Sequence, residues 1–411
     1  MSSKGSSRRR FLKEGVALTG LAAAGARPGM GQVETSQVVK NTRPYGERSR
    51  FVTSARIPDD PTSRSPAILT PIQDSAGIIT PSGLHFIAEH YDGVDIDPQQ
   101  HRLLIHGMVD RPLIFTMDDL KRLPAVSRVH FLECPGNTSL RRSKNTESIQ
   151  QTHGRTSCSE WTGVLLSVLL RRAGVQKGAS WIVAESADRA RYIKSIPLDK
   201  AMDDILLAYY QNGEPVRPEQ GFPLRLFVPG WEAISSVKWL RRIEVVDQPH
   251  MARWETITHG SIRGDGKARW FEFEMGPKSV ITRPSLGQRL PSRGYYEITG
   301  LAWSGGGGIR RVEVSTDGGR TWKDAQIHEP VYRMAHTRFS LDWTWDGTEQ
   351  VIQSRCTDER GDVQPTLEQL AEVWGVDMEY WKTTTNNVLK FNPIFRWRVT
   401  RDGSVQNALF S

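Results

Sequence analysis

Cys134 is the residue of this 411-residue chain whose setting most strongly suggests chemistry. It follows Val129 to Leu132, which we expect to form a buried strand, and it opens a Cys-Pro-Gly-Asn turn. A sulfur at the end of a strand can project into a cleft, and a thiolate is a soft ligand for a high-valent metal. A buried structural role is the commoner fate of a lone cysteine, so the residue alone leaves both interpretations open.

The cysteine count limits the kind of metal site. The chain has three cysteines, none in a CxxC pair, and it contains no CxxCH, so c-type haem attachment within this chain is excluded. Four-cysteine zinc sites and iron–sulfur clusters are excluded by the count. One cysteine can still serve as a single metal ligand. We expect Cys158 and Cys356 to be structural.

The first 26 residues resemble a twin-arginine export signal. Ser7 to Lys13 (SRRRFLK) precede an apolar run, Val16 to Ala24, that is too short to cross a bilayer, and Ala24-Gly25-Ala26 resembles a cleavage site. Twin-arginine signals export folded proteins. We therefore expect a periplasmic protein with a redox cofactor inserted before export; a basic disordered terminus is the alternative.

Composition and charge exclude several protein classes. Hydrophobic residues make up 38% of the chain and charged residues 24%, which excludes disorder, collagen-like structure and a polytopic membrane protein. About half of the net charge of +8 lies in the first 26 residues, so nucleic acid is not an expected partner. No later segment has the roughly 18 apolar residues that a membrane span needs, so we expect no span in the mature chain.

The elements expected before residue 276 are mixed. Residues 27–75 are polar and rich in Pro, Ser and Arg, which predicts an extended arm on the surface. Residues 76–275 alternate strands with helices over Thr116 to Arg122, capped by Thr116, and over Val164 to Ala173, ended by Gly174. In the second helix we expect Leu165, Val168 and Leu169 to share one apolar stripe. The remaining strands are expected at residues 103–107, 129–132, 180–185, 224–228 and within 237–246.

Residues 276–400 alternate apolar and polar positions in short runs. Asp317-Gly318-Gly319 between two such runs is a strong hairpin signal. The absence of helical patterns there predicts a β-sandwich of the immunoglobulin type. The predicted fold class is therefore α+β, with a sandwich following a mixed domain.

Several motifs, in order along the chain, resemble the sulfite oxidase family of molybdenum enzymes, and most of all the molybdenum subunits of bacterial sulfane dehydrogenases. The matching stretches are residues 79–90 (ITPSGLHFIAEH), 133–137 (ECPGN), 161–166 (WTGVLL), 221–225 (GFPLR), 228–232 (VPGWE), 237–242 (VKWLRR), 300–306 (GLAWSGG) and 317–322 (DGGRTW). The order and spacing of these stretches carry the resemblance, since none is decisive alone.

The resemblance implies a function and its partners. The expected cofactor is a molybdenum–pyranopterin in residues 76–275, with no haem in this chain and with Cys134 as the protein ligand to the metal. The expected reaction is oxidation of sulfite or protein-bound sulfane sulfur, with electrons passed to a separate c-type cytochrome. The sandwich, residues 276–400, is expected to form a homodimer.

The resemblance also assigns cofactor contacts. Besides Cys134, the expected contacts are Phe86, His90, Asp188, Gln220, Arg225, Ser236 and Lys238. Arg225 can bind the pterin phosphate through its planar fork, and Lys238 can do so as a point charge. Taken alone, His90 and Lys238 are more often surface residues.

Several positions depart from the family pattern. Ala88, Thr138 and Ser139 stand where many sulfite oxidases have arginines, Gln220 replaces a histidine, and His259 falls at an active-site tyrosine. A less cationic pocket favours protein-bound sulfane sulfur over the free sulfite dianion.

Other arginines can restore positive charge at the metal. Candidates are Arg141, Arg142, Arg396 and Arg398, each of which is otherwise an ordinary surface residue. We expect Cys134, His259 and Arg396 to be the catalytic residues.

Two other functions remain open. A molybdopterin reductase of the methionine sulfoxide or nitrate type can use the same scaffold. A non-enzymatic exported binding protein is the third possibility.

Overall fold

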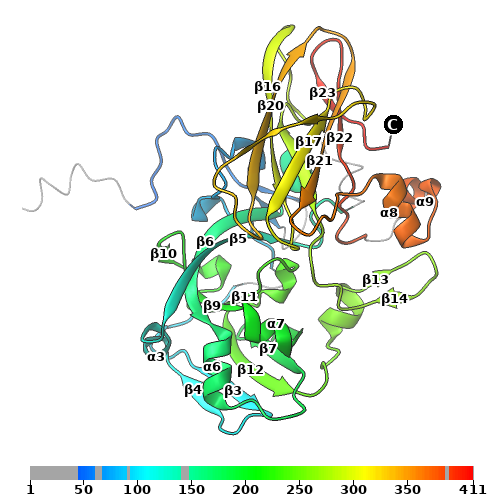
Figure 1. Cartoon of the computed structure of the whole chain (residues 1–411). Coiled ribbons are helices and arrows are strands. Elements are labelled where there is room, and N and C mark those ends of the chain that lie inside the picture. The colour runs from blue at the N-terminus through cyan, green and yellow to red at the C-terminus, as the bar shows by residue number, and fades with distance from the viewer. Residues whose placement is uncertain (1–44, 61–66, 90–92, 140–147, 385–387, 411) are drawn as a thin grey trace, which may run out of the picture. The chain divides into compact units, whose positions relative to one another are not determined.

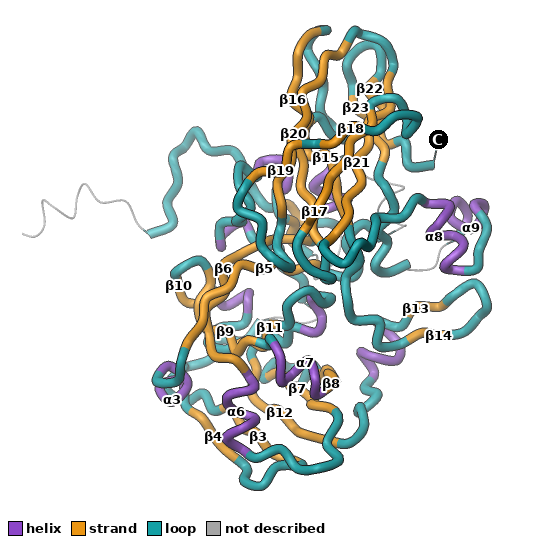
Figure 2. Tube along the Cα trace, viewed as in Figure 1, coloured by secondary structure: helices purple, strands orange, loops and turns teal. Residues whose placement is uncertain are grey.

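Short strands and loops make up most of the chain, with a few short helices between them (Figures 1 and 2). The computed structural model describes residues 45–60, 67–89, 93–139, 148–384 and 388–410. All elements named below lie within the unit Thr53–Ser411. The expected export signal lies outside the described residues, as do His90, Arg141 and Arg142.

The mixed domain contains two five-stranded sheets. The first has the order β10-β9-β6-β5, with β11 also paired to β9, and all its pairs are antiparallel. Its strands are β5 (Ala125–Glu133), β6 (Thr156–Leu165), β9 (Leu206–Gln211), β10 (Glu214–Pro215) and β11 (Arg225–Phe227).

The second sheet has the order β4-β3-β12-β7-β8, and β12 runs parallel to β3. Its strands are β3 (Leu103–Gly107), β4 (Leu113–Phe115), β7 (Trp181–Ser186), β8 (Ile193–Pro197) and β12 (Leu240–Val246). Fully buried residues such as Ile105, Leu226 and Ile243 join both sheets into one apolar core.

Short helices and turns precede, connect or follow these strands along the chain. They are α3 (Met117–Lys121), α5 (Ile149–His153), α6 (Leu166–Ala173), α7 (Leu198–Asp203), the 3₁₀ turns η1 (Ile72–Asp74), η2 (Ser82–Leu84), η3 (Pro218–Gln220) and η4 (Ala233–Ser235), and a π-helical turn η5 (Trp254–Thr258). Thr116 caps α3 as predicted, by accepting from the Asp119 amide.

The expected helix over Val164 to Ala173 begins two residues later than predicted, because Val164 and Leu165 complete β6. Its buried stripe is therefore Leu166, Leu169, Leu170 and Ala173, and the predicted stripe through Leu165 and Val168 is wrong. Gly174 ends the helix in the left-handed conformation, as expected.

The second domain is a β-sandwich, as predicted. One sheet has the order β15-β16-β20-β19 and the other β18-β17-β21-β22-β23. Its strands are β15 (Lys278–Arg283), β16 (Gly294–Trp303), β17 (Ile309–Ser315), β18 (Lys323–Asp324), β19 (Gln326–His328), β20 (Thr337–Trp345), β21 (Gln350–Asp358), β22 (Arg396–Val399) and β23 (Val405–Asn407). The hairpin at Asp317-Gly318-Gly319 joins β17 and β18, and Cys356 is buried in β21.

The expectation that this region lacks helices is wrong. It contains α8 (Leu367–Trp374) and α9 (Met378–Thr383). The signal was present in the sequence, because Thr366 and Gln369 form a capping box and Leu367, Leu370 and Trp374 share the buried face. A short hairpin of β13 (Ser261–Ile262) and β14 (Ala268–Arg269) precedes the sandwich.

The arm predicted over residues 27–75 is not confined to the surface. Strands β1 (Ile57–Pro58) and β2 (Ile68–Leu69) pair with each other, and Ala67, Leu69 and Ile72 are buried. This part of the segment therefore belongs to the core. Among the described residues, no helix is both long enough and apolar enough to cross a lipid bilayer.

A buried ion pair links the two domains. The ammonium of Lys278 on β15 lies 2.6 Å from Glu133 Oε1 at the end of β5, and the two side chains are 1% and 0% exposed. Asn137 donates to the same carboxylate oxygen at 2.9 Å, and the Trp303 indole donates to the other at 2.7 Å. Both oxygens of Glu133 are therefore satisfied, which a buried charge requires.

We expect Lys278→Met to lower the free energy of unfolding by about 3–5 kcal/mol, because the Glu133 carboxylate would stay buried without its cation. Urea denaturation measures this loss. The double variant Lys278→Met/Glu133→Gln should recover part of it. Arg355→Met, which breaks a partly exposed ion pair with Glu313, should lose less than about 1 kcal/mol. An equally small loss in Lys278→Met would contradict this account.

Candidate active site

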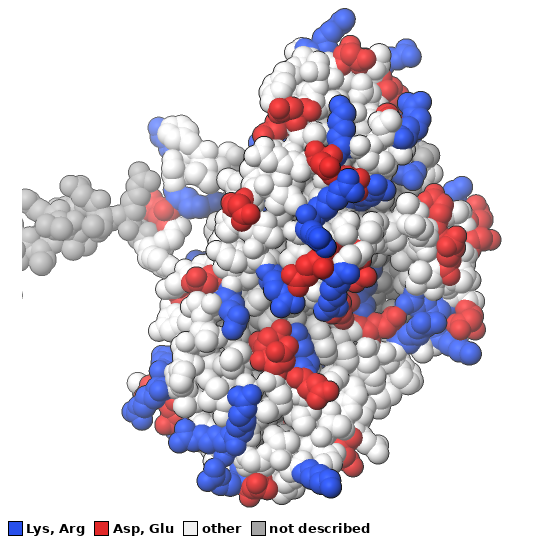
Figure 3. All heavy atoms as spheres, in the orientation of Figure 1, with Lys and Arg blue, Asp and Glu red and all other residues white. Residues whose placement is uncertain are grey.

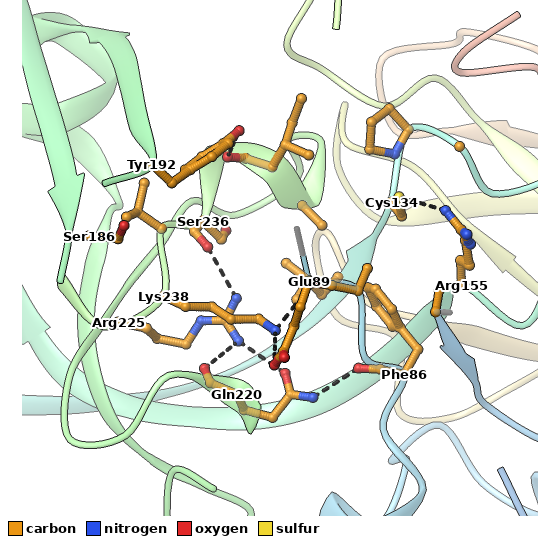
Figure 4. Close-up of a pocket in the computed structure, with 18 of the residues that line it drawn as sticks. Phe86, Glu89, Cys134, Arg155, Ser186, Tyr192, Gln220, Arg225, Ser236 and Lys238 are labelled. Atoms are coloured by element: carbon orange, nitrogen blue, oxygen red, sulfur yellow. Dashed lines mark hydrogen bonds and ion pairs between the residues drawn. The ribbon is translucent and has the colours of Figure 1, made fainter. Parts of the chain in front are cut away.

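A cavity of about 320 Å³ lies where several strand ends and loops of the mixed domain meet. Seven of the eight predicted cofactor contacts line it: Phe86, Cys134, Asp188, Gln220, Arg225, Ser236 and Lys238. The eighth, His90, lies outside the described residues. Figure 4 shows Cys134 on one side of this cavity and the group of Arg225, Lys238 and Gln220 on the other.

Cys134 directly follows β5, and its half-buried sulfur faces the cavity. The Cys134 amide donates to the Arg155 carbonyl at 3.0 Å, and the Asn137 amide donates back to the Cys134 carbonyl at 2.8 Å. These bonds fix the Cys-Pro-Gly-Asn turn. The sulfur is thus presented to open space, as predicted, and is not enclosed in apolar packing. Cys158, by contrast, is fully buried, and burial raises the pKa of its thiol to about 12.

Arg225 is a buried cation that forms no ion pair with any described carboxylate. Its side chain donates to Gln220 Oε1 at 3.2 Å and to the backbone oxygens of Gln220 and Ser236 at 3.0 and 3.3 Å. Only 1% of the residue is exposed, and burial lowers the pKa of the guanidinium to about 9. A buried charge without a counterion is unfavourable, so the position suits an anionic ligand.

Lys238 adds a second cation on the same side. Its ammonium lies 3.3 Å from Glu89 Oε1 and donates to the carbonyls of Ala88 and Glu219 at 3.3 and 2.7 Å. The pKa of Lys238 is lowered to about 8, mainly by burial and also by the nearby Arg225, while Glu89 opposes the shift. Two neighbouring cations with one carboxylate between them leave positive charge for a ligand such as phosphate.

Neutral and acidic groups complete the wall. The Ser186 hydroxyl donates to Asp188 Oδ1 at 2.5 Å, and the Tyr192 amide donates to the same oxygen at 3.3 Å. The Ser236 hydroxyl accepts from the Val228 amide at 3.0 Å. Such fixed donors and acceptors can recognise a polar ring system.

His259 also lines the cavity, immediately after η5, and its Nδ1 donates to the Trp254 carbonyl at 2.8 Å. Arg396 does not reach the cavity. It lies on β22 of the sandwich, where its Nε donates to Gln353 of the paired strand at 3.1 Å. Arg398 faces Glu349 at 3.5 Å. Arg396 of this chain therefore does not supply positive charge at the cavity, contrary to the prediction.

Sequence reasoning missed Arg155. Its Nη1 lies 3.8 Å from the Cys134 sulfur, and its Nη2 pairs with Asp59. Since Glu133 of β5 pairs with Thr156 of β6, Cys134 and Arg155 stand opposite each other where the ladder ends. Only the strand register reveals this neighbour, and 20 intervening residues separate the two in sequence. Glu89, which lies within the matching stretch of residues 79–90, also lines the cavity, as do Tyr192 and Trp239, which were not predicted as contacts.

The residues that line the cavity suit a metal ion whose other ligands come from a bound organic group and not from the protein. Among the described residues, no group of three or more His, Cys, Asp and Glu side chains could hold a metal ion, and Cys134 is the one cysteine among the residues that line this cavity. The uncompensated guanidinium of Arg225 then suits the anionic part of an organic ligand. A metal held by a phosphate-bearing organic group satisfies both features.

Comparison with known proteins agrees with this reading of the cavity. Residues 90–254 match the oxidoreductase molybdopterin binding domain, and residues 269–387 match the Mo-co oxidoreductase dimerisation domain. The crystal structure of the sulfane dehydrogenase SoxCD from Paracoccus pantotrophus is 39% identical, with a TM-score of 0.84 over 93% of this chain and 96% of that one.

Two curated relatives are more distant. Mitochondrial sulfite oxidase of Rattus norvegicus is 30% identical over 327 residues, which are 72% of this chain and 59% of that protein. An NADH nitrate reductase of Ulva prolifera is 32% identical over 302 residues, which are 66% of this chain and 34% of that protein. The chain therefore spans about a third to three fifths of the length of these two relatives.

We expect Arg225→Met to lower the phosphorus and metal that co-purify with the protein about tenfold, because a charged hydrogen-bond donor to the ligand is lost. Elemental analysis measures both. Arg225→Lys should lose less, since it keeps the charge but not the planar fork. The melting temperature of the ligand-free variant should not fall, because a buried unpaired charge is removed. Full phosphorus content in Arg225→Met would rule out Arg225 as the phosphate contact.

Proposed function

Since the chain belongs to the sulfite oxidase family of molybdopterin oxidoreductases, we propose that it oxidises sulfur compounds at a bound molybdenum cofactor and prefers protein-bound sulfane sulfur to free sulfite. The observation that carries the proposal is the half-buried sulfur of Cys134, which lines a cavity that also contains the uncompensated cation Arg225. The 39% identity to a sulfane dehydrogenase over nearly the whole chain supports the choice of substrate class.

The chain's own residues divide the work of holding the cofactor. When bound, the molybdenum cofactor supplies two-electron redox and oxygen-transfer chemistry. Cys134 would bind the metal, and Arg225 with Lys238 would bind the phosphate. Asp188, positioned by Ser186, would accept from the amino groups of the pterin.

The residues near Cys134 favour a substrate with little charge. Ala88, where many relatives in the family have arginine, lines the cavity as a small apolar side chain. Thr138 and Ser139, which also replace arginines, are buried. Arg155 is the described cation nearest the sulfur, and Asp59 neutralises it. A sulfite dianion would therefore gain little binding energy from the described residues near Cys134. The uncharged end of a sulfane chain does not need a cation there, so its binding would not be weakened.

His259 is our candidate for a proton-handling residue. Its Nδ1 donates to the Trp254 carbonyl, so Nε2 is the ring nitrogen without a proton in the neutral imidazole. Its position on the cavity wall supports this role.

We propose a separate c-type cytochrome as electron acceptor. No CxxCH occurs in the 411 residues, so these residues offer no attachment site for a c-type haem. Figure 3 shows Lys and Arg interspersed with Asp and Glu over one face of the molecule, so that face carries no patch of a single sign to mark the acceptor.

Two further proposals concern assembly and location. Export through the twin-arginine route to the periplasm is supported by residues 1–26 as a sequence. Homodimerisation through the sandwich is supported by the match of residues 269–387 to a dimerisation domain.

We expect Cys134→Ala to lose sulfur-oxidising activity by more than a thousandfold while keeping its fold, because no other described thiolate lines the cavity. Activity is measured with a protein-bound sulfane substrate and cytochrome c as acceptor, and molybdenum by elemental analysis. Cys158→Ala is the matched control, and its activity should stay near that of the wild type. A wild-type protein without molybdenum, or full activity in Cys134→Ala, would overturn the proposal.

The same assay separates oxidation from reduction. A reductase of the nitrate or methionine sulfoxide type is the second candidate, favoured by the 32% identity to a nitrate reductase. Turnover with reduced viologen as donor, and none with cytochrome c as acceptor, would establish that function instead.

We expect Ala88→Arg to raise kcat/KM for free sulfite about tenfold, because a guanidinium facing the cavity would attract the dianion. Steady-state kinetics at constant ionic strength measure the change, and Ala88→Met controls for side-chain bulk. The gain should lie mainly in KM. An equal gain in Ala88→Met would show that charge is not what the pocket lacks.

A further inference from the structure

Arg155 is held beside the Cys134 sulfur from two directions. Its backbone carbonyl accepts from the Cys134 amide at 3.0 Å, and its own amide donates to Asn137 Oδ1 at 3.0 Å. Its side chain then returns over the turn, so that Nη1 lies 3.8 Å from the sulfur, within range of an N–H···S contact. The residue is therefore part of the turn that presents the thiolate.

A carboxylate from the amino-terminal segment fixes the other end of the guanidinium. Asp59 pairs with Arg155 Nη2, and the two side chains are only 4% and 17% exposed. Asp59 is itself anchored, because its amide donates to the Ala67 carbonyl at 2.8 Å next to the β1–β2 pair. Figure 4 shows the guanidinium directed at Cys134.

The turn leaves room for this arrangement. A Cβ atom at Gly136 would stand 3.4 Å from Arg155 Nη1 and 3.8 Å from the sulfur, so the guanidinium and the sulfur both lie against this residue of the turn. An arginine guanidinium stays protonated in proteins, so this side chain brings a positive charge next to the sulfur.

We propose that Arg155, clamped by Asp59, is a positioning residue that donates an N–H to the Cys134 sulfur and raises the reduction potential of the metal this sulfur binds. The inference rests on the proposed function. A hydrogen bond and a positive charge at a ligating sulfur draw electron density from it and stabilise the reduced, more negative state of the centre.

The electrostatic role predicts opposite effects for the two partners. Arg155→Met removes a positive charge and should lower the potential, with about a tenfold change in the reduction equilibrium, or about 30 mV for a two-electron couple. Asp59→Asn removes a negative charge while the backbone of Arg155 stays anchored to the cysteine turn, so it should raise the potential. The reduction potential of Arg155→Lys should lie between those of the wild type and Arg155→Met, since an ammonium keeps the positive charge but lacks the planar, two-pronged guanidinium.

The experiment is a redox titration of the molybdenum-loaded full chain, followed through its paramagnetic molybdenum signal, with metal content measured on each sample. Arg355→Met, an arginine in an ion pair of the sandwich, is the control and should leave the potential unchanged. Purely structural damage would shift Arg155→Met and Asp59→Asn in the same direction, and that result would overturn the inference.

Molybdenum content and reduction potential together distinguish a wrong role for Arg155 from a wrong proposed function. A wild-type protein without molybdenum overturns both. Molybdenum-loaded wild type and Arg155→Met with equal potentials overturn only the role of Arg155. Should Arg155→Met fail to fold, Asp59→Asn carries the test, and an unchanged or lowered potential in that variant overturns the inference.

Discussion

The buried pair of Glu133 and Lys278 is the interaction on which the site depends. Glu133 immediately precedes Cys134, and its cation comes from the first strand of the sandwich. Taking two charges out of water is costly unless every lone pair is satisfied, and here Trp303, Asn137 and Lys278 satisfy the carboxylate. The network specifies one geometry for the end of β5. The direction of the sulfur is thereby determined jointly by both domains.

From this anchored sulfur the cavity divides into two regions of different charge. Around Arg225 and Lys238, positive charge exceeds the carboxylate available, which is unfavourable until an anion binds. Around Cys134 the nearest described cation is already paired with Asp59. One region therefore gains energy from holding a permanent anionic cofactor. The other offers no unpaired described cation to an anion.

Local sequence signals predicted much of this arrangement, and nonlocal contacts account for what they missed. Strand patterns, the Thr116 cap and the hairpin at Asp317 depend on neighbours in sequence and were confirmed. The motifs around Cys134 and Arg225 carried a family resemblance, and both residues line the cavity. Arg155 and Asp59 could not be found that way, because their proximity depends on the β5–β6 register and on β1–β2 folding back. Arg396 failed for the same reason: its strand pairing directs it to Gln353.

The boundary between the domains in sequence is not a boundary of the site. Leu389, which follows the helices of the second domain, lines the cavity, and the Lys390 amide donates to the Pro135 carbonyl at 2.7 Å within the cysteine turn. The Thr138 hydroxyl, at the end of that turn, contacts the Phe391 carbonyl. A fragment ending before the sandwich would lose Lys278, Trp303 and this segment together. The position of Cys134 therefore depends on the folded sandwich of the same chain, whether or not the sandwich also joins two chains.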